Sequence, residues 1–305
     1  APNLEVLVVL RFVQALGGSA GMVVPRAMVR DMYSGTELAR TLSAITMVFA
    51  IGPVLAPLLG GLILMVAPWP WLFIALAIFG VLCIFGVFML PETLPRERRT
   101  TNGLAGTLDN FRIVGSDRGF WLPTAILGLN MILLFSYISS GPAVFVDSFG
   151  LSSTMFGIVF GINSAFIVVG ARLNMHLLGR FRPHTLMRAF LMISVGASVV
   201  LLLLAIVGVP VVVFIVPVII ATACVQAVGA NASAELLHPF GERAGAAASL
   251  SGVIQMSLGA LTAAVLGIGL LRPPLQMSLG MVIAGTAALL LALRPPPAFE
   301  EAPHA

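Results

Sequence analysis

One arginine lies inside the first apolar run of this sequence, and its neighbours indicate a polar lining. Arg11 is followed by Gln14, Gly18, Met22 and Pro25, which share roughly one face of a helix with about 3.6 residues per turn. A guanidinium in hydrocarbon costs roughly a few kcal/mol, so such a residue usually faces a cavity or a partner. The alternative is that Arg11 extends to the nearby outer headgroup region.

The most polar of the apolar runs contains Asn130, Tyr137 and several serines, followed by a Gly-Pro pair. A polar patch before Gly-Pro is typical of a bent or unwound helix end, where transporters place binding groups. The simpler interpretation is that these side chains only bond neighbouring helices, each contributing about 0.6 kcal/mol. Two further polar residues, Asn163 and Gln226, lie among small residues on later runs.

The other reactive residue types do not indicate metal or disulfide chemistry. Cys83 and Cys224 fall in the middle of different apolar runs and are interpreted as small apolar fillers. His176 and His184 fall in a basic segment, too far apart for a metal site, and are interpreted as solvated loop residues. We expect no metal and no cofactor. Acidic residues are few, and none lies deep in an apolar run.

Composition shows what kind of protein holds these residues. Hydrophobic residues make up 59% of the 305 positions and charged residues 9%, against roughly 25% charged in soluble domains, and the mean hydropathy is +1.08. The sequence therefore predicts an all-α membrane protein. A crossing needs about 20 apolar residues, and nine runs satisfy this: about 4–30, 37–66, 70–90, 120–147, 153–179, 184–208, 211–238, 242–270 and 273–294.

The sixteen basic residues are all arginines, and their distribution predicts the orientation of the chain. If the loop after the first run is cytoplasmic and the runs alternate, nearly all arginines fall at the inner side, with Arg272 outside and Arg11 within a run. The sequence pI of about 10.0 then reflects arginines gathered on the cytoplasmic side of the membrane. No nucleic-acid partner is expected. Arg30 and Asp31, at the inner end of the first run, are either solvated caps or a latch for an inward gate.

The run from Phe49 to Gly61 contains two prolines and three glycines. Such a run would break a soluble helix, but in a bilayer neighbouring helices can bond the freed backbone groups. We expect a bent helix with a flat face for close packing. Its small residues are Gly52, Pro53, Ala56, Pro57, Gly60 and Gly61, and the fifth run has a similar face at Gly157, Gly161 and Ala165.

A short repeat relates the first and seventh runs. Residues 13–17, VQALG, recur as VQAVG at 225–229, six runs later, as in transporters built from two parallel six-helix halves. On this arithmetic the chain begins three helices into a twelve-helix protein. The predicted segments are the last three helices of an N-terminal half (1–90), a cytoplasmic central loop (91–119) with a short surface helix at 104–114, a complete C-terminal half (120–294) and a cytoplasmic tail (295–305).

Several of these motifs resemble the major facilitator superfamily, and within it the Bcr/CflA group of drug-efflux proteins. Arg11, Gln14 and Gly17 match the fourth-helix R-x-x-Q-G-type motif, except that Ala15 stands where Gly is usual, and the Gly/Pro run matches the fifth-helix antiporter motif. The other matches are Trp69, Trp71 and Phe73 of a W-x-W-x-F marker, Pro91, Glu92 and Thr93 of a P-E-T-L marker, and Tyr137, Ile138, Ser139, Ser140 and Pro142 of a seventh-helix signature.

The resemblance implies the superfamily fold and proton-driven export of small compounds, of which chloramphenicol, bicyclomycin and sulfonamides are typical. It implies a role in proton coupling for Arg11 and Gln14, and packing of the Gly/Pro face against the fifth run. The group's membrane-embedded acid and its gating motif between the second and third helices have no counterpart in this sequence. The expected cleft is lined by Arg11, Gln14, Asn130, Tyr137, Asn163 and Gln226.

We therefore expect a proton-coupled drug exporter of the bacterial inner membrane, with a drug-like molecule, protons and lipid as partners, and a monomer if the chain is complete. One alternative is a transport-incompetent chain that needs a partner segment. Another is a membrane-embedded acyl or glycosyl transferase. That enzyme would need His, Asp or Glu clustered at one membrane face, and the sequence offers only scattered ones.

Overall fold

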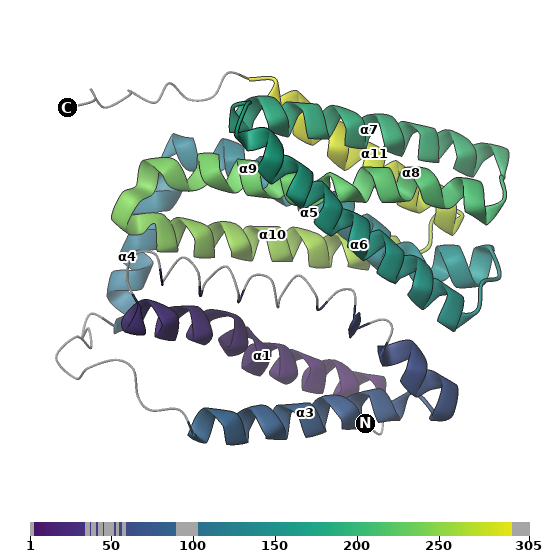
Figure 1. The fold of residues 1–305 in the computed structure, drawn as a ribbon, viewed down its shortest axis with the longest axis horizontal. Coiled ribbons are helices and arrows are strands. Elements are labelled where there is room, and N and C mark those ends of the chain that lie inside the picture. The colour runs from purple at the N-terminus through teal and green to yellow at the C-terminus, as the bar shows by residue number, and fades with distance from the viewer. Residues whose placement is uncertain are drawn as a thin grey trace. The chain divides into compact units, whose positions relative to one another are not determined.

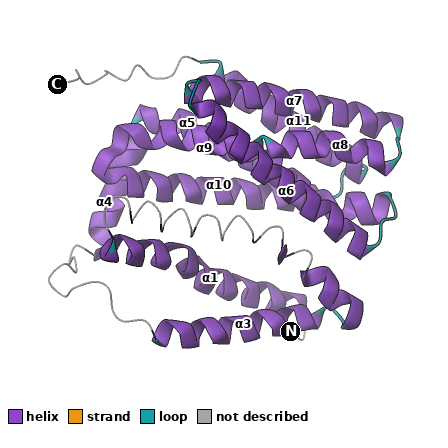
Figure 2. Cartoon of the chain, in the orientation of Figure 1, coloured by secondary structure: helices purple, strands orange, loops and turns teal. Residues whose placement is uncertain are grey.

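The computed structural model describes residues 3–33, 59–89 and 103–294, with the single positions Glu37, Thr41, Ile45, Gly52, Leu55 and Ala56. Every secondary-structure element in these ranges is a helix (Figure 2). Seven of the described helical segments are long and apolar enough to cross a membrane. They coincide with the third to ninth predicted runs and confirm the all-α membrane class. The first run is helix α1 (Leu4–Met32), whereas the second lies largely outside the described residues.

The chain divides into two compact units. Unit 1 comprises residues 1–56 and 63–101, and its helices are α1 and α3 (Pro70–Phe88). Unit 2 comprises residues 57–62 and 102–305. Its helices are α4 (Gly103–Ser116), α5 (Arg118–Pro142), η2 (Ala143–Ser148), α6 (Ser153–Leu178), α7 (Pro183–Val207), α8 (Val211–Ala223), α9 (Val225–Leu237), η3 (His238–Arg243), α10 (Ala244–Gly267) and α11 (Pro273–Ala292).

Unit 2 is a helix bundle in which α5 packs against α10 and α11, while α7 packs against α8, α9 and α11 (Figure 1). Local signals set the helix ends. The side chains of Asp117 and Ser152 cap α5 and α6 by accepting bonds from backbone N–H groups, as N-cap residues do. Helix α7 ends at Gly208, whose φ of 76° is a left-handed conformation that favours glycine.

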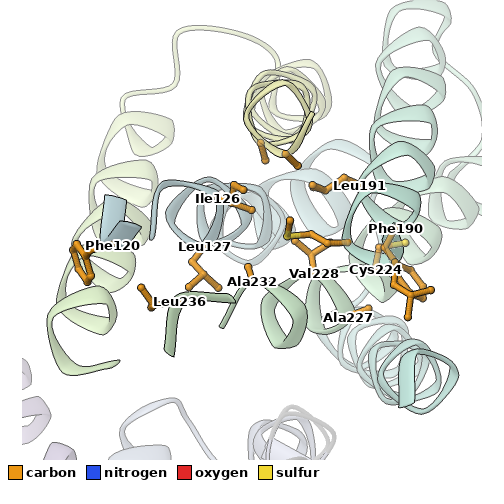
Figure 3. Packing of buried hydrophobic residues seen from close by; sticks show 14 of the residues in the cluster. Phe120, Ile126, Leu127, Phe190, Leu191, Cys224, Ala227, Val228, Ala232 and Leu236 are labelled. Atoms are coloured by element: carbon orange, nitrogen blue, oxygen red, sulfur yellow. The ribbon is translucent and has the colours of Figure 1, made fainter. Parts of the chain in front are cut away.

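Buried apolar residues fill the space between these helices. One cluster lies between α5, α7, α9 and α11 and includes Leu127, Leu191 and Val228 (Figure 3). A second cluster surrounds Tyr137 and Phe145. Together they fix how α5 and α9 are rotated, and so which of their side chains face a cavity.

Two features of unit 2 differ from the sequence expectations. Of the two expectations at Gly141 and Pro142, the unwound end is wrong, because α5 remains helical to Pro142 and continues as the π-helix η2, whereas a bend there stays a prediction. Proline lacks an N–H and displaces the carbonyl one turn earlier, and the chain accommodates this with a wider turn, in which Phe149 N bonds Val144 O at 3.1 Å. The seventh run is two helices, α8 and α9, separated at Cys224.

The short helix predicted at 104–114 is confirmed as α4. It packs against α10, α5 and η3, and Val114 on its inner face is fully buried. That α4 lies along a membrane surface stays a prediction.

The basic start of α7 is tied to the end of α11. Arg188 Nε donates to Ala292 O at 2.7 Å, and its Nη2 lies 3.1 Å from the carbonyl oxygens of Leu293 and Arg294. The last carbonyls of a helix have no partner within it, so one guanidinium satisfies the end of α11. This contact places two arginine-bearing helix ends together, as the positive-inside distribution requires.

Helices α6 and α8 approach so closely that one position between them must be glycine. A Cβ on Gly170 would lie 2.0 Å from Ala223 O. Small residues of this kind let membrane helices pack backbone to backbone.

We predict that Gly170→Ala lowers the thermal unfolding midpoint of the purified protein, because α6 must move away from α8, at a cost of roughly 1–3 kcal/mol for such overpacking. The matched control is Gly196→Ala on α7, where a Cβ would meet no described atom within 4 Å, and which should leave the midpoint unchanged. Equal midpoints for the two variants would contradict the close contact.

Candidate functional site

The break between α8 and α9 is held by polar side chains from two other helices. Ser194 Oγ of α7 donates to Ala221 O at 3.0 Å, and Asn130 Nδ2 of α5 donates to Val225 O at 3.0 Å. Both side chains are buried. Backbone groups freed inside a bilayer need such partners, because water is absent there. Asn130, a predicted cleft residue, therefore has a structural role at the break.

A cavity of about 300 Å³ lies beside this break in unit 2. Its polar groups are three amide side chains and one serine hydroxyl, and none of the described lining residues is charged. A Cβ on Gly229 would lie 3.7 Å from Asn130 Nδ2, so glycine keeps the space in front of this amide open. The lining residues are Leu127, Asn130, Met131 and Leu134 of α5, Val225, Gln226, Gly229, Ala230 and Ser233 of α9, and Gln255 of α10.

Asn130 and Gln226 are thus two predicted cleft residues that the structure brings together. Ser233 and Gln255 were not among the residues predicted for this cleft. Ser233 lies seven residues after Gln226, on the same helical face, so periodicity alone was a signal for it. Gln255 Nε2 bonds Ser251 Oγ at 3.0 Å within α10, and only the packing of α10 places it at the cavity.

Two other predicted cleft residues, Tyr137 and Asn163, lie outside the cavity lining and are almost fully buried, with 1% exposed surface each. Tyr137 follows the lining residue Leu134 by three positions, about one helical turn. Its ring stacks on Phe160, with centroids 5.5 Å apart. Asn163 Oδ1 accepts a bond from Thr222 Oγ1 at 2.7 Å.

The hydroxyl of Tyr137 interacts with the Asn163 side chain, and Thr222 Oγ1 lies 2.8 Å from Val218 O, so Tyr137, Asn163 and Thr222 can satisfy one another's hydrogen-bonding groups.

The remaining predicted cleft residues, Arg11 and Gln14, lie on α1 in unit 1. Both are exposed, and Arg11 Nη1 donates to Gln14 Oε1 at 2.9 Å. The Arg11 guanidinium carbon also lies 5.1 Å from the centre of the Phe73 ring on α3, within the range of a cation–π contact. A role for this pair in a cleft shared with unit 2 stays a prediction.

The predicted packing and gate residues are only partly described. Gly157 and Gly161 are buried on α6, whereas Ala165 is exposed. Gly52 and Ala56 are exposed, and Gly60 and Gly61 are half-buried. Pro53, Pro57 and the side chains of Arg30 and Asp31 lie outside the described residues. The packing of the two small-residue faces and the cytoplasmic latch therefore stay predictions.

The sequence interpretation of His184 is wrong. It lies in the first turn of α7 with 16% of its side chain exposed, and its Nδ1 is 2.7 Å from Glu235 Oε1. Glu235 belongs to the last turn of α9. These residues are 51 positions apart, and no local pattern could pair them. His176 is also helical, in the last turn of α6, and is exposed.

Comparison with known proteins identifies the architecture that holds this cavity. Residues 1–264 match the Major Facilitator Superfamily. The chain is 31% identical over 271 residues to the uncharacterized MFS-type transporter YdgK of Bacillus subtilis, which covers 88% of this chain and 67% of that protein.

Two other relatives have names that refer to drug resistance. The bicyclomycin resistance protein homolog of Haemophilus influenzae is 28% identical over 259 residues, 83% of this chain and 64% of that protein. The multidrug resistance protein MdtL of Citrobacter koseri is 28% identical over 302 residues, 96% of this chain and 74% of that protein. The chain thus spans 64% to 74% of the length of these three relatives. The match over most of its helices shows that this chain is a multi-pass membrane protein that belongs to the Major Facilitator Superfamily.

Proposed function

We propose that this protein exports small drug-like molecules across the bacterial inner membrane by alternating access, as a monomer and in exchange for protons. The observation that carries the proposal is the cavity between α5, α9 and α10. A few amide and hydroxyl groups on an otherwise apolar wall suit small molecules of mixed polarity. The drug-resistance names of two relatives support the same substrate class.

Each group of residues has a role in this proposal. Asn130 and Gln226 contact the substrate, and Tyr137 and Asn163 complete the cleft. Arg11 and Gln14 act in proton coupling from unit 1, and Arg30 with Asp31 latches the cytoplasmic side. The segments are the end of an N-terminal half (1–90), a cytoplasmic loop (91–119), a C-terminal half (120–294) and a cytoplasmic tail (295–305).

The small-residue faces of the Gly/Pro run and of α6 form a seam between the halves in this proposal. Gly52, Ala56 and Gly60 would meet Gly157, Gly161 and Ala165. Glycine and alanine allow helices to approach closely enough to exclude leak.

Export in exchange for protons predicts that an imposed pH gradient drives drug movement. Everted membrane vesicles that contain the protein should accumulate labelled chloramphenicol when their interior is made acidic, because protons leaving the vesicle exchange for drug entering it. A protonophore should abolish the accumulation. Uptake that is indifferent to the gradient and to the protonophore would remove proton exchange from the proposal, and the absence of any uptake above empty vesicles would remove export.

We predict that Gln226→Leu raises the KM for chloramphenicol export by roughly three- to tenfold, the equivalent of one lost hydrogen bond. Gln226 lines the cavity and is exposed to it, so the change should leave the amount of protein in the membrane unaltered. Val253→Leu is the control, since Val253 is exposed on α10 outside the cavity lining. An unchanged KM in Gln226→Leu would contradict a role of the cavity in substrate binding.

The proposed seam predicts that Gly157→Leu abolishes or uncouples export, because a leucine side chain forces the two helices apart, while insertion into the membrane continues. Flux and membrane-fraction immunoblots measure the two effects separately. Gly196→Leu serves as the control, because Gly196 is exposed on α7 with open space around it. Normal coupled export by Gly157→Leu would show that the seam is elsewhere.

A further inference from the structure

We infer that His184 and Glu235 form the site that binds the exchanged proton, and that His184 Nε2 is the atom that accepts it. The inference rests on the export function proposed above and adds to it the residues that carry the proton. Arg11 cannot carry it, because a guanidinium keeps its proton in proteins.

Burial distinguishes this pair from the other titratable residues whose side chains the structure describes. Within that set, Glu235 is the only carboxylate and His184 the only histidine that is not exposed. Their side chains are 13% and 16% exposed. Ionisable residues inside a membrane bundle are costly to bury and usually mark a pathway for an ion or a proton. The exposed acids and histidines are Glu5, Glu37, Asp109, Asp117, Asp147, His176 and His238.

The hydrogen bond between the two side chains leaves one ring nitrogen open. His184 Nδ1 lies 2.7 Å from Glu235 Oε1, and an ionised carboxylate only accepts, so Nδ1 carries a hydrogen. In a neutral imidazole the other nitrogen then has a free lone pair. That nitrogen, Nε2, is buried and has no hydrogen-bond partner among the described residues. It is therefore the atom that can take up a proton.

Proton binding changes the charge of the pair and the strength of the contact between α7 and α9. With a neutral imidazole, the pair carries the single negative charge of Glu235. A proton from water that binds Nε2 produces an imidazolium and a carboxylate with no net charge. Paired charges are less costly to bury than a single charge, and hydrogen bonds between them are stronger. The contact between the helices is therefore tighter with the proton bound than after its release to water.

Among the described residues, no other charged group replaces either partner. Arg188 lies one turn after His184 on α7, but its guanidinium bonds carbonyl oxygens at the end of α11. Helices α8 and α10 contain no charged residue, and the side chain of Glu242 lies outside the described residues. The other charged or titratable groups on or beside the helices that pack against α7 and α9 are exposed, namely Asp117, Arg118, Arg172, His176, Arg180, Arg182, His238, Arg243, Arg272 and Arg294.

The buried titratable groups on these helices lie far from the pair. Cys224 is eleven positions before Glu235, roughly 16 Å along the helix axis. Phe120, at the start of α5, contacts Phe240 of η3, and Tyr137 is a further 17 positions along α5, roughly 25 Å. Neither group can exchange a proton directly with the pair.

The helix that carries Glu235 also carries one wall of the cavity. Gln226, Gly229 and Ser233 of α9 line the cavity, and Gln226 is nine positions before Glu235, roughly 13 Å along the helix. A shift of α9 when its contact with α7 loosens would move these lining groups as well. Proton release and drug binding are thereby linked through one helix, as an exchange of drug for protons requires.

The competing explanation is a structural pair that only ties α7 to α9. The two explanations differ for a variant that keeps this contact but cannot take up the proton. In His184→Gln the new amide can still donate to Glu235, and the pair keeps one negative charge, like the form that has released its proton. A purely structural pair would tolerate this change, whereas a proton site would not.

The test uses everted vesicles and labelled chloramphenicol in two assays. In the first, an acidic interior drives accumulation. In the second, vesicles preloaded with unlabelled drug exchange it for labelled drug in the presence of a protonophore, which needs no net proton movement. For His184→Gln we expect loss of the driven accumulation, with drug exchange at the parent rate. Glu235→Gln, which retains an acceptor oxygen for His184 Nδ1, should also lose the driven accumulation.

The controls are His176→Gln and Asp109→Asn, which change exposed side chains and should leave both assays unchanged. Driven accumulation at the parent level in His184→Gln or Glu235→Gln would overturn the proton site and leave the export function standing. Loss of both assays in His184→Gln, with normal amounts of protein in the membrane, would show a structural pair instead. Parent vesicles that exchange drug but do not respond to the gradient would refute proton exchange itself, and the site with it.

Discussion

The need to satisfy backbone groups without water organises the C-terminal bundle. Helix α8 ends at Ala223 and α9 begins at Val225, and the last carbonyl oxygens of α8 need partners that only protein can supply inside a bilayer. Ser194 bonds one of these oxygens, Ala221 O, and Asn130 bonds Val225 O in the first turn of α9. Because Asn130 is held in this way, its position at the cavity wall is set by the backbone of another helix and does not depend on a ligand.

Close packing of small residues makes these bonds geometrically possible. Gly170 brings α6 against the backbone at Ala223, and this approach lets Asn163 reach Thr222 across the same interface. The α6–α9 contact is completed by a reciprocal amide pair, in which Asn231 Nδ2 donates to Asn174 Oδ1 at 2.8 Å. At this interface glycine therefore sets how closely the helices approach, and asparagine side chains form the hydrogen bonds that this distance allows.

The elements that depend on local composition could be predicted from the sequence, and those that depend on contacts between helices could not. Hydropathy located α3 and the helices from α5 onward to within a few residues, because a long apolar run is a property of the chain itself. The seventh run divides at Cys224, whose backbone is itself in the right-handed helical region, and no proline lies beside it to mark the division. The pairing of His184 with Glu235 likewise depends on how α7 and α9 are rotated.

The candidate site was predictable to a similar extent. Polar residues in apolar runs are rare enough that Asn130 and Gln226 were found by inspection, and the structure places both on one cavity. Tyr137 and Asn163 were found for the same reason, but their burial behind the lining results from the rotation of α5 and α6. No sequence pattern predicts how a helix is rotated about its axis when both of its faces are apolar.

Helix α5 is followed by the π-helical turn η2, which has about one residue more per turn than an α-helix. A return of residues 143–148 to α-helical pitch would lengthen this end by about 1.5 Å and rotate the residues after it by roughly 100°. That rotation would separate Phe149 from Phe214, whose ring centres lie 5.1 Å apart, while Tyr137, which precedes the turn, would stay in place. Such a change would alter the length of this end and its aromatic contacts together, and it would leave the polar groups that precede it in α5 where they are.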